Sequence, residues 1–278
     1  MKRRRLLGLA LGMPVFGGCD PASGTDGLPA RQVVARRRSP YGTLTVVDQG
    51  GRRYLTHDPQ GSTATVQSSL DLARPDALAA SYARLMMLAM AQADQTRRVL
   101  QIGVGAGSMA SYVVRNWPQT RVDAVELDPV AIELGIEHFN LRPHPRLAIH
   151  IADGRAWLAA SNERFDVVML DAYDDRTIPA ALADASFFAL VAERLAPGGA
   201  VAQNAYRGGV DVAALRATMR RAFEHVDEYG LPENAVLLGY QGAPLAGPAL
   251  LARAQAIDAQ VRPLHPLAEL IAHRVDRR

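Results

Sequence analysis

An apolar strand that runs directly into a glycine-rich turn constrains this chain more than any other feature. Residues 99–107 read VLQIGVGAG, and a helical pattern follows from Ser108. The next apolar run, about twenty residues further on, closes with the acidic residues Glu126 and Asp128. This order is typical of a nucleotide-type ligand bound at the first βα turn of a doubly wound sheet.

Each part of this segment has a physical role toward such a ligand. Gly103, Gly105 and Gly107 let the backbone approach the ligand closely, and the following helix presents free N–H groups. A carboxylate at the end of the second strand can accept hydrogen bonds from both ribose hydroxyls. The glycine spacing differs from the dinucleotide fingerprint, whose third glycine lies one place later. An ordinary tight βα turn is therefore the alternative interpretation.

Strand and helix patterns alternate from Arg97 onward and predict the fold class. Strands are expected at 97–103, 121–127, 146–151, 165–171 and 199–205, and helices at 107–116, 129–140, 153–160, 184–195 and 210–223. The final strands, 225–230 and 234–240, have so short a link that it suits an antiparallel hairpin. The pattern predicts an α/β fold, a doubly wound, mainly parallel, seven-stranded sheet with helices on both faces.

A small β unit is predicted ahead of the sheet, over residues 32–70. Strand 43–48 is β-branched and turns at Gln49-Gly50-Gly51 into a returning strand, and a third strand is possible at 63–67. The α/β domain is expected to fill residues 71–278.

Two helical segments are predicted at the edges of that domain. A long apolar helix is expected from Asp76 to about Ala93, because large apolar residues recur there at helical spacing. We interpret its methionine-rich stripe as core packing. Residues 248–275 predict a helix interrupted near Pro263 and Pro266.

The start of the chain has the pattern of an export leader and a tether. Basic residues 2–5 precede the apolar stretch 6–16, and two glycines precede Cys19, the only cysteine. Segment 1–19 resembles a bacterial lipoprotein signal with Cys19 as the lipidated residue, and its arginines also resemble a twin-arginine signal. Residues 20–31 are rich in Gly, Pro, Ser and Asp and predict a flexible tether. A mis-assigned start or a basic tail is the alternative.

Charge and residue usage exclude several function classes. The net charge of +3 includes the four positive charges of residues 2–5, so the rest of the chain gives no argument for nucleic-acid binding. The seven histidines show no paired ligand spacing, which predicts no metal site. No serine–histidine–acid order suggests a hydrolase.

Acidic residues follow three successive strands, at the edge where ligands of such sheets bind. The set comprises Glu126 and Asp128 after the second strand, Asp153 with Gly154 after the third, and Asp171 and Asp174 after the fourth. Stability explains this set poorly, because like charges crowd one rim. Such a rim favours cationic ligands.

Residues 97–206 resemble the S-adenosylmethionine-binding fold of class I methyltransferases and, more narrowly, the polyamine aminopropyltransferases, or spermidine synthases. The matching motifs are Val125-Glu126-Leu127-Asp128, Ile151-Ala152-Asp153-Gly154, Asp171-Ala172-Tyr173-Asp174 and Leu195-Ala196-Pro197-Gly198-Gly199. In the resembled family these are the ribose-binding strand end, the adenine-contacting segment, the catalytic loop and the stretch before the fifth strand.

The resemblance implies transfer of an aminopropyl group from decarboxylated S-adenosylmethionine to a small cationic amine, without a metal. It implies that Asp171 accepts or positions the amine proton, and that Asp174, Gln67 and Tyr173 bind the substrate. The residues implied in donor binding are Gly103, Gly105, Gly107, Glu126, Asp128, Asp153 and Gly154. A homodimer is the usual assembly of the resembled family.

Three departures from the family pattern leave other functions open. Ala106 stands where the family turn has an aspartate for the donor's amine, Asp175 replaces a proline, and the Tyr-His-Glu segment is reduced to Tyr82. The alternatives are S-adenosylmethionine-dependent methyl transfer and a non-catalytic exported lipoprotein that binds a polyamine or nucleoside. The leader favours an anchor at the inner membrane through Cys19, whereas the resemblance favours the cytoplasm.

Overall fold

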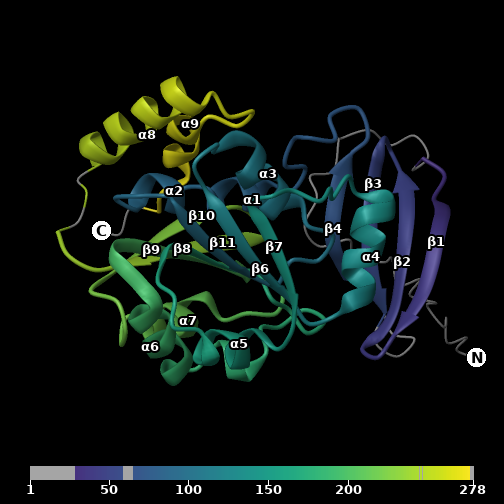
Figure 1. Ribbon diagram of the computed structural model, residues 1–278, viewed down its shortest axis with the longest axis horizontal. Coiled ribbons are helices and arrows are strands. Elements are labelled where there is room, and N and C mark those ends of the chain that lie inside the picture. The colour runs from purple at the N-terminus through teal and green to yellow at the C-terminus, as the bar shows by residue number, and fades with distance from the viewer. Residues whose placement is uncertain (1–28, 59–64, 244, 246, 276–278) are drawn as a thin grey trace, which may run out of the picture.

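The computed structural model describes residues 29–58, 65–243, 245 and 247–275. The predicted leader 1–19 with Cys19, and most of the predicted tether, lie outside the described residues. The described chain contains two sheets, a small antiparallel one at the N-terminal end and a larger one that forms the centre of the molecule (Figure 1). Within the described residues, no helix combines the length and the apolar character needed to span a membrane.

The predicted β unit is an antiparallel meander of four strands, one more than the sequence indicated. Its strands, in spatial order, are β1 (Gln32–Ser39), β2 (Gly42–Gln49), β3 (Arg52–Asp58) and β4 (Thr65–Asp71). Gly50 and Gly51 have φ of 58° and 73°, the left-handed values that a tight hairpin turn needs. Strand β1 carries no separate signal in the sequence, and it completes the sheet at its outer edge.

The central sheet has seven strands in the order β10-β11-β9-β8-β5-β6-β7, and the predicted fold class is confirmed. The strands are β5 (Arg98–Ile102), β6 (Arg121–Glu126), β7 (Leu147–Ile151), β8 (Phe165–Leu170), β9 (Leu195–Tyr206), β10 (His225–Gly230) and β11 (Asn234–Tyr240). All neighbours from β9 to β7 pair in parallel, whereas β11 pairs antiparallel with both β9 and β10. The predicted C-terminal hairpin is therefore confirmed.

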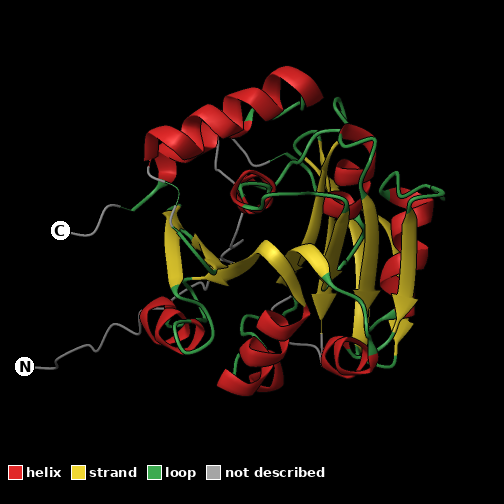
Figure 2. Ribbon diagram, turned by 60° about the vertical axis from the view of Figure 1, so that its left-hand side comes forward, coloured by secondary structure: helices red, strands yellow, loops and turns green. Residues whose placement is uncertain are grey.

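Helices cover both faces of this sheet (Figure 2). They are α1 (Ser81–Met86), α2 (Ala89–Gln92), α3 (Ser108–Asn116), α4 (Pro129–His138), α5 (Gly154–Ala160), α6 (Ala185–Arg194), α7 (Val212–Met219), α8 (Gly247–Val261) and α9 (Leu267–Leu270), with short 3₁₀ turns at Ala180–Leu182 and Ile271–His273. One apolar core joins α1, α2, α3 and α8 to the sheet, and a second joins α5, α6 and α7. The predicted interruption of the C-terminal helix lies between α8 and α9.

The N-terminal sheet packs on α4 and on the glycine-rich turn. Leu44, Val46 and Leu55 share an apolar cluster with Leu134 of α4 and with Ala106 of the turn. Figure 1 shows α4 lying alongside β2. The β unit is thereby held against the carboxyl-terminal edge of the central sheet, where the predicted site residues lie.

The prediction of a single long helix over residues 76–93 is wrong. The segment instead forms α1 and α2, and it is extended at Ala80, with φ −80° and ψ 129°. The N–H of Leu78 donates to the imidazole of His265, and the Arg84 guanidinium donates to the carbonyl oxygen of Leu78. A continuous helix would need that carbonyl oxygen as the acceptor for the N–H of Tyr82, whereas the Leu78 N–H would lie in its first turn and need no helical partner. The methionine-rich stripe is core as predicted, since Met86 and Met90 are fully buried.

Candidate functional site

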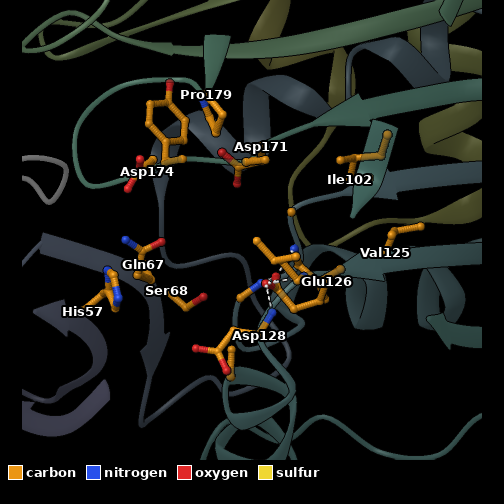
Figure 3. A pocket seen from close by; sticks show the side chains of 18 of the residues that line it. His57, Gln67, Ser68, Ile102, Val125, Glu126, Asp128, Asp171, Asp174 and Pro179 are labelled. Atoms are coloured by element: carbon orange, nitrogen blue, oxygen red, sulfur yellow. Dashed lines mark hydrogen bonds between the residues drawn. The ribbon is translucent and has the colours of Figure 1, made fainter. Parts of the chain in front are cut away.

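A cavity of about 400 Å³ opens at the carboxyl ends of the parallel strands, beneath the N-terminal sheet. Its volume lies within the range typical of small-molecule sites, roughly 300–1,000 Å³. In Figure 3, Asp171 and Asp174 lie on one side, Glu126 and Asp128 on another, and the side chains from β3 and β4 on a third. The cavity therefore brings together residues from both sheets.

The glycine-rich turn is packed tightly against other parts of the site. Gly103 has a φ of 81°, and a Cβ built on it would collide with the backbone carbonyl of Asp171. Gly105 has a φ of 54°, and its Cβ would lie 2.5 Å from the hydroxyl oxygen of Ser68. These two glycines allow the turn to approach the catalytic loop and β4. Gly107 begins α3 and packs against Leu141, and it does not line the cavity.

The Glu126 carboxylate occupies the N–H groups of the turn. One oxygen accepts from Val104 and Gly105, both at 2.8 Å, and the other accepts from Leu127 at 2.9 Å and Asp128 at 3.0 Å. The Ala106 N–H donates to the Ser68 hydroxyl at 2.9 Å. Three backbone donors of the turn, those of Val104, Gly105 and Ala106, are therefore already engaged. The arrangement favours an uncharged ribose over a phosphate at this turn.

Two further predicted acids hold fixed positions because they cap helices. Asp128 accepts from the N–H of Val130 at the start of α4, and Asp153 accepts from the N–H of Ala156 at the start of α5. Both carboxylates line the cavity from these positions. Gly154 is required for packing, because a Cβ there would collide with the side chain of Ile102.

Asp171 lies at the end of β8, where its carboxylate is held by two side chains. Tyr82 donates its hydroxyl to Oδ2 at 3.1 Å, and Asn204 donates Nδ2 to Oδ1 at 2.9 Å. Burial raises the pKa of the Asp171 carboxyl to about 7, and the negative charge of Glu126 adds to the rise. The two hydrogen bonds act in the opposite direction. Asp171 therefore exchanges a proton near neutral pH, as a general base or acid must.

The three predicted substrate-binding residues all line the cavity. The Tyr173 hydroxyl donates to the Asn204 carbonyl oxygen at 3.0 Å and accepts from the Tyr206 N–H, so it anchors the loop to β9. Burial raises the pKa of the Tyr173 hydroxyl above its ordinary value. Asp174 is exposed, and a tight turn to Thr177 fixes its backbone. Gln67 projects from β4, and its amide donates to Thr65.

The structure adds cavity residues that no sequence motif indicates. Tyr41, His57 and Ser68 come from the N-terminal sheet, and they join Tyr82 of α1, the remnant of the Tyr-His-Glu segment named above. Asn204 has a second partner, Asn234, whose position in the sequence carries no signal of a site. These contacts depend on strand register and on the docking of the two sheets, which local patterns do not encode. The predicted Cys19 lies outside the described residues.

The charge of the cavity is one-sided. Five carboxylates line it, those of Glu126, Asp128, Asp153, Asp171 and Asp174, and the described lining residues include no Arg or Lys. Within the described part of the chain, no group of three His, Cys, Asp or Glu residues is placed to hold a metal ion. The arrangement suits a cationic ligand.

Comparison with known protein families gives a match over the same part of the chain. The family model described as the spermine/spermidine synthase domain matches residues 80–229. A probable polyamine aminopropyl transferase from Bifidobacterium longum is 36% identical over 127 residues, which are 46% of this chain and 28% of that protein. The chain thus spans less than a third of that relative's length.

Solved structures resemble the described fold. A probable spermidine synthase from Corynebacterium glutamicum has a TM-score of 0.68 at 22% identity, covering 88% of this chain and 96% of that one. Human methyltransferase-like protein 13, in complex with SAH, has a TM-score of 0.59 at 26% identity, covering 65% of this chain and 92% of that one. The first supports the fold of both sheets, and the second the methyltransferase-like fold.

Proposed function

This chain belongs to the spermine/spermidine synthase domain family, and we propose that it transfers an aminopropyl group from decarboxylated S-adenosylmethionine to a polyamine-type amine. The observation that carries the proposal is the one-sided charge of the cavity, with five carboxylates and no Arg or Lys among its described lining residues. A sulfonium donor and an ammonium-bearing acceptor are both cations, so both gain from this charge.

We assign the donor to the side of the cavity formed by the glycine-rich turn. In this assignment Glu126, at the end of β6, and Asp128, just after it, bind the ribose hydroxyls, and Asp153 with Gly154 bind the adenine. The turn at Gly103 and Gly105 faces the remaining part of the donor. Because Glu126 already holds the turn's N–H groups, a neutral nucleoside fits better here than a nucleotide.

We assign the acceptor amine to the side formed by Asp171 and Asp174. Its nitrogen must be neutral to attack the donor methylene group next to the sulfonium sulfur. The new C–N bond forms as the C–S bond breaks, and the electron pair leaves with sulfur as a neutral thioether. Asp171 takes the proton that the nitrogen gives up, and Asp174 pairs with a second ammonium group of the acceptor. Gln67 and Tyr173 contribute to the wall against which the acceptor lies.

A second candidate, S-adenosylmethionine-dependent methyl transfer, rests on Ala106. This residue is fully buried in the apolar cluster beneath the β unit, so the turn supplies no carboxylate for an aminopropyl amine. The likeness to human methyltransferase-like protein 13 supports the same alternative. In that reaction Asp171 would take the proton of an amine acceptor in the same way, and the group transferred would be methyl in place of aminopropyl.

The experiment that tests the proposal is a transfer assay on the purified full chain. The chain is incubated with decarboxylated S-adenosylmethionine and a panel of diamines, and products are identified by mass spectrometry. We expect 5′-methylthioadenosine and an aminopropylated amine in equal amounts. Formation of a methylated amine from S-adenosylmethionine would replace the proposal with the second candidate. No product with either donor would favour a non-catalytic binding protein.

Location and assembly are separate proposals. We propose that segment 1–19 directs export and that Cys19 anchors the chain to the inner membrane, and that the chain forms a homodimer. Expression in bacteria with labelled palmitate tests the anchor, with Cys19→Ser as the unlabelled control. Light scattering of the purified chain tests the dimer. A label retained in Cys19→Ser would contradict the anchor, and a monomer mass would contradict the dimer.

A further inference from the structure

A chain of polar side chains leads away from Asp171 into the sheet. Strands β8 and β9 pair in parallel up to Leu170 opposite Gln203, so Asp171 comes next to Asn204. Asn204 in turn lies opposite Val236 of β11, and Asn234 is two residues from Val236 on the same face of that strand. Three adjacent strands therefore place Asp171, Asn204 and Asn234 in a row.

These three side chains are joined by short hydrogen bonds. Asn234 donates Nδ2 to Oδ1 of Asn204 at 2.9 Å, and Asn204 donates Nδ2 to Oδ1 of Asp171 at 2.9 Å. Both asparagines are buried, with 3% of Asn204 and 6% of Asn234 exposed. Burying amide groups costs free energy that apolar residues at these positions would avoid. Neither asparagine lines the cavity, so neither is placed to contact a ligand directly.

We propose that Asn204 and Asn234 are positioning residues that orient the Asp171 carboxylate and hold it as a hydrogen-bond acceptor. The side-chain amide of Asn204 could face Asp171 with either its oxygen or its nitrogen. Because Asn234 donates to the oxygen, the nitrogen is directed to Asp171. One carboxylate oxygen is thereby fixed to the sheet. The other, bonded to Tyr82, remains on the side of the cavity, where an acceptor amine would lie.

The charged and titratable groups around Asp171 explain why the two asparagines affect the protonation of its carboxylate. Glu126 of β6 faces it with a negative charge, Tyr82 of α1 donates to it, and Tyr173 and Asp174 belong to its own loop. His57 of β3 lines the same cavity. Burial and Glu126 favour the protonated form, while Asn204 and Tyr82 favour the charged form. Asn204, held by Asn234, thus offsets the burial and the Glu126 charge that favour the neutral carboxyl of Asp171.

The use of this carboxylate in catalysis rests on the proposed function, but the positioning device does not. It can therefore be measured without turnover. The full chain is labelled with carboxyl-¹³C aspartate, and the Asp171 resonance is identified as the one lost in Asp171→Asn. Its titration midpoint is then followed in wild type, Asn204→Leu and Asn234→Leu. Tyr229→Phe is the matched control, because it removes a buried hydroxyl from the neighbouring strand β10 that has no hydrogen-bond partner among the described residues.

We expect Asn204→Leu to raise the Asp171 midpoint by about one pH unit, because a donor to the charged form is lost. Asn234→Leu removes the donor to Oδ1 of Asn204 and adds no charge, so the Asn204 nitrogen is no longer directed to Asp171, and the midpoint rises again. The control should leave it unchanged. If Asn204→Leu fails to fold, Asn234→Leu decides. An Asp171 midpoint equal to that of wild type in the folded asparagine variants would overturn the proposal.

Kinetics then separate positioning from folding. Where transfer is observed, the pH at which kcat is half-maximal should move upward with the titration midpoint in both asparagine variants, while the KM for the donor stays within about twofold. A uniform loss of kcat at every pH, without a shift, would show a structural role only and would contradict the proposal. Absence of transfer in wild type would overturn the proposed function and leave the titration result intact.

Discussion

The two sides of the cavity hold their carboxylates in different ways. On the side of the glycine-rich turn, Glu126 accepts four backbone N–H groups, and Asp128 and Asp153 each cap a helix. On the opposite side, side chains hold Asp171, and Asp174 is exposed. Backbone contacts fix a geometry that few substitutions can change. Side-chain contacts leave the chemistry of Asp171 adjustable by its neighbours.

This contrast suggests a division of work between the sides. The backbone-held side suits a donor whose nucleoside part must bind the same way in every cycle. The side-chain-held side suits proton transfer, which requires a pKa near the working pH. Variants on each side of the cavity test whether this division holds.

Asp171→Asn should have the largest effect, because it removes the proposed base. We expect the transfer rate to fall by at least about a hundredfold, within the range for loss of general acid–base catalysis, with donor affinity within about twofold of wild type. The rate is measured as 5′-methylthioadenosine formed. Asp175→Asn is the matched control, since Asp175 lies in the same loop but does not line the cavity, and asparagine tolerates its φ of 57°. Full activity in Asp171→Asn would contradict the division.

Glu126→Ala should weaken donor binding next most strongly. A hydrogen bond to a charged group is worth about 1.5–3 kcal/mol, so the loss of even one contact to the ribose should raise the donor Kd by about 10–150-fold. Titration calorimetry measures the change, and Glu133→Ala on the surface of α4 is the control. An unchanged Kd would mean that the ribose binds elsewhere in the cavity.

The pH dependence of stability should distinguish Asp171 from the other acids. Its folded-state pKa of about 7 is higher than the ordinary value of 3.8, so the native chain keeps a proton that the unfolded chain releases. The free energy of unfolding therefore decreases as pH rises from about 4 to about 7, relative to a variant without this group. Urea unfolding of wild type and Asp171→Asn at pH 5 and pH 8 tests this. If the difference in the free energy of unfolding between the two proteins is the same at both pH values, the raised pKa of Asp171 is refuted.

Ser68→Ala should have the smallest effect of the series. It removes one hydrogen bond, to the N–H of Ala106, worth about 1 kcal/mol. We expect a loss of donor affinity of about fivefold, because this bond holds the turn against β4. Calorimetry compares Ser68→Ala with Ser69→Ala, since Ser69 is a neighbouring buried serine whose hydroxyl has no partner among the described residues. The comparison isolates the contribution of the Ser68 hydroxyl to donor affinity. Equal affinities in both variants would show that β4 does not support the turn.

Most of the central sheet could be predicted from the sequence, because parallel strands and their helices carry strong periodic patterns. The segment 76–93 could not, since its backbone is extended at Ala80, where the Leu78 carbonyl oxygen accepts from Arg84 and the Leu78 N–H donates to the distant His265. Helical spacing reports one buried face, and it does not reveal side-chain contacts that hold the backbone extended. Tertiary contacts of this kind have no local signal.

The residues of the candidate site also divide into those that the sequence could predict and those that it could not. Acids that end parallel strands, such as Glu126 and Asp171, could be predicted to meet because the topology brings those ends to one edge. Ser68 and His57 could not, since they reach the cavity only when the N-terminal sheet docks on α4. Asn234 became visible only through the antiparallel register of β11.

The most direct test of the central claim is the donor preference of the purified full chain. Calorimetry with decarboxylated S-adenosylmethionine, S-adenosylmethionine and 5′-methylthioadenosine compares ligands that share a nucleoside and differ in charge. Because the described cavity lining offers carboxylates and no Arg or Lys, we predict that the decarboxylated donor binds tightest. Tighter binding of S-adenosylmethionine, or no binding of any of the three, would contradict the account.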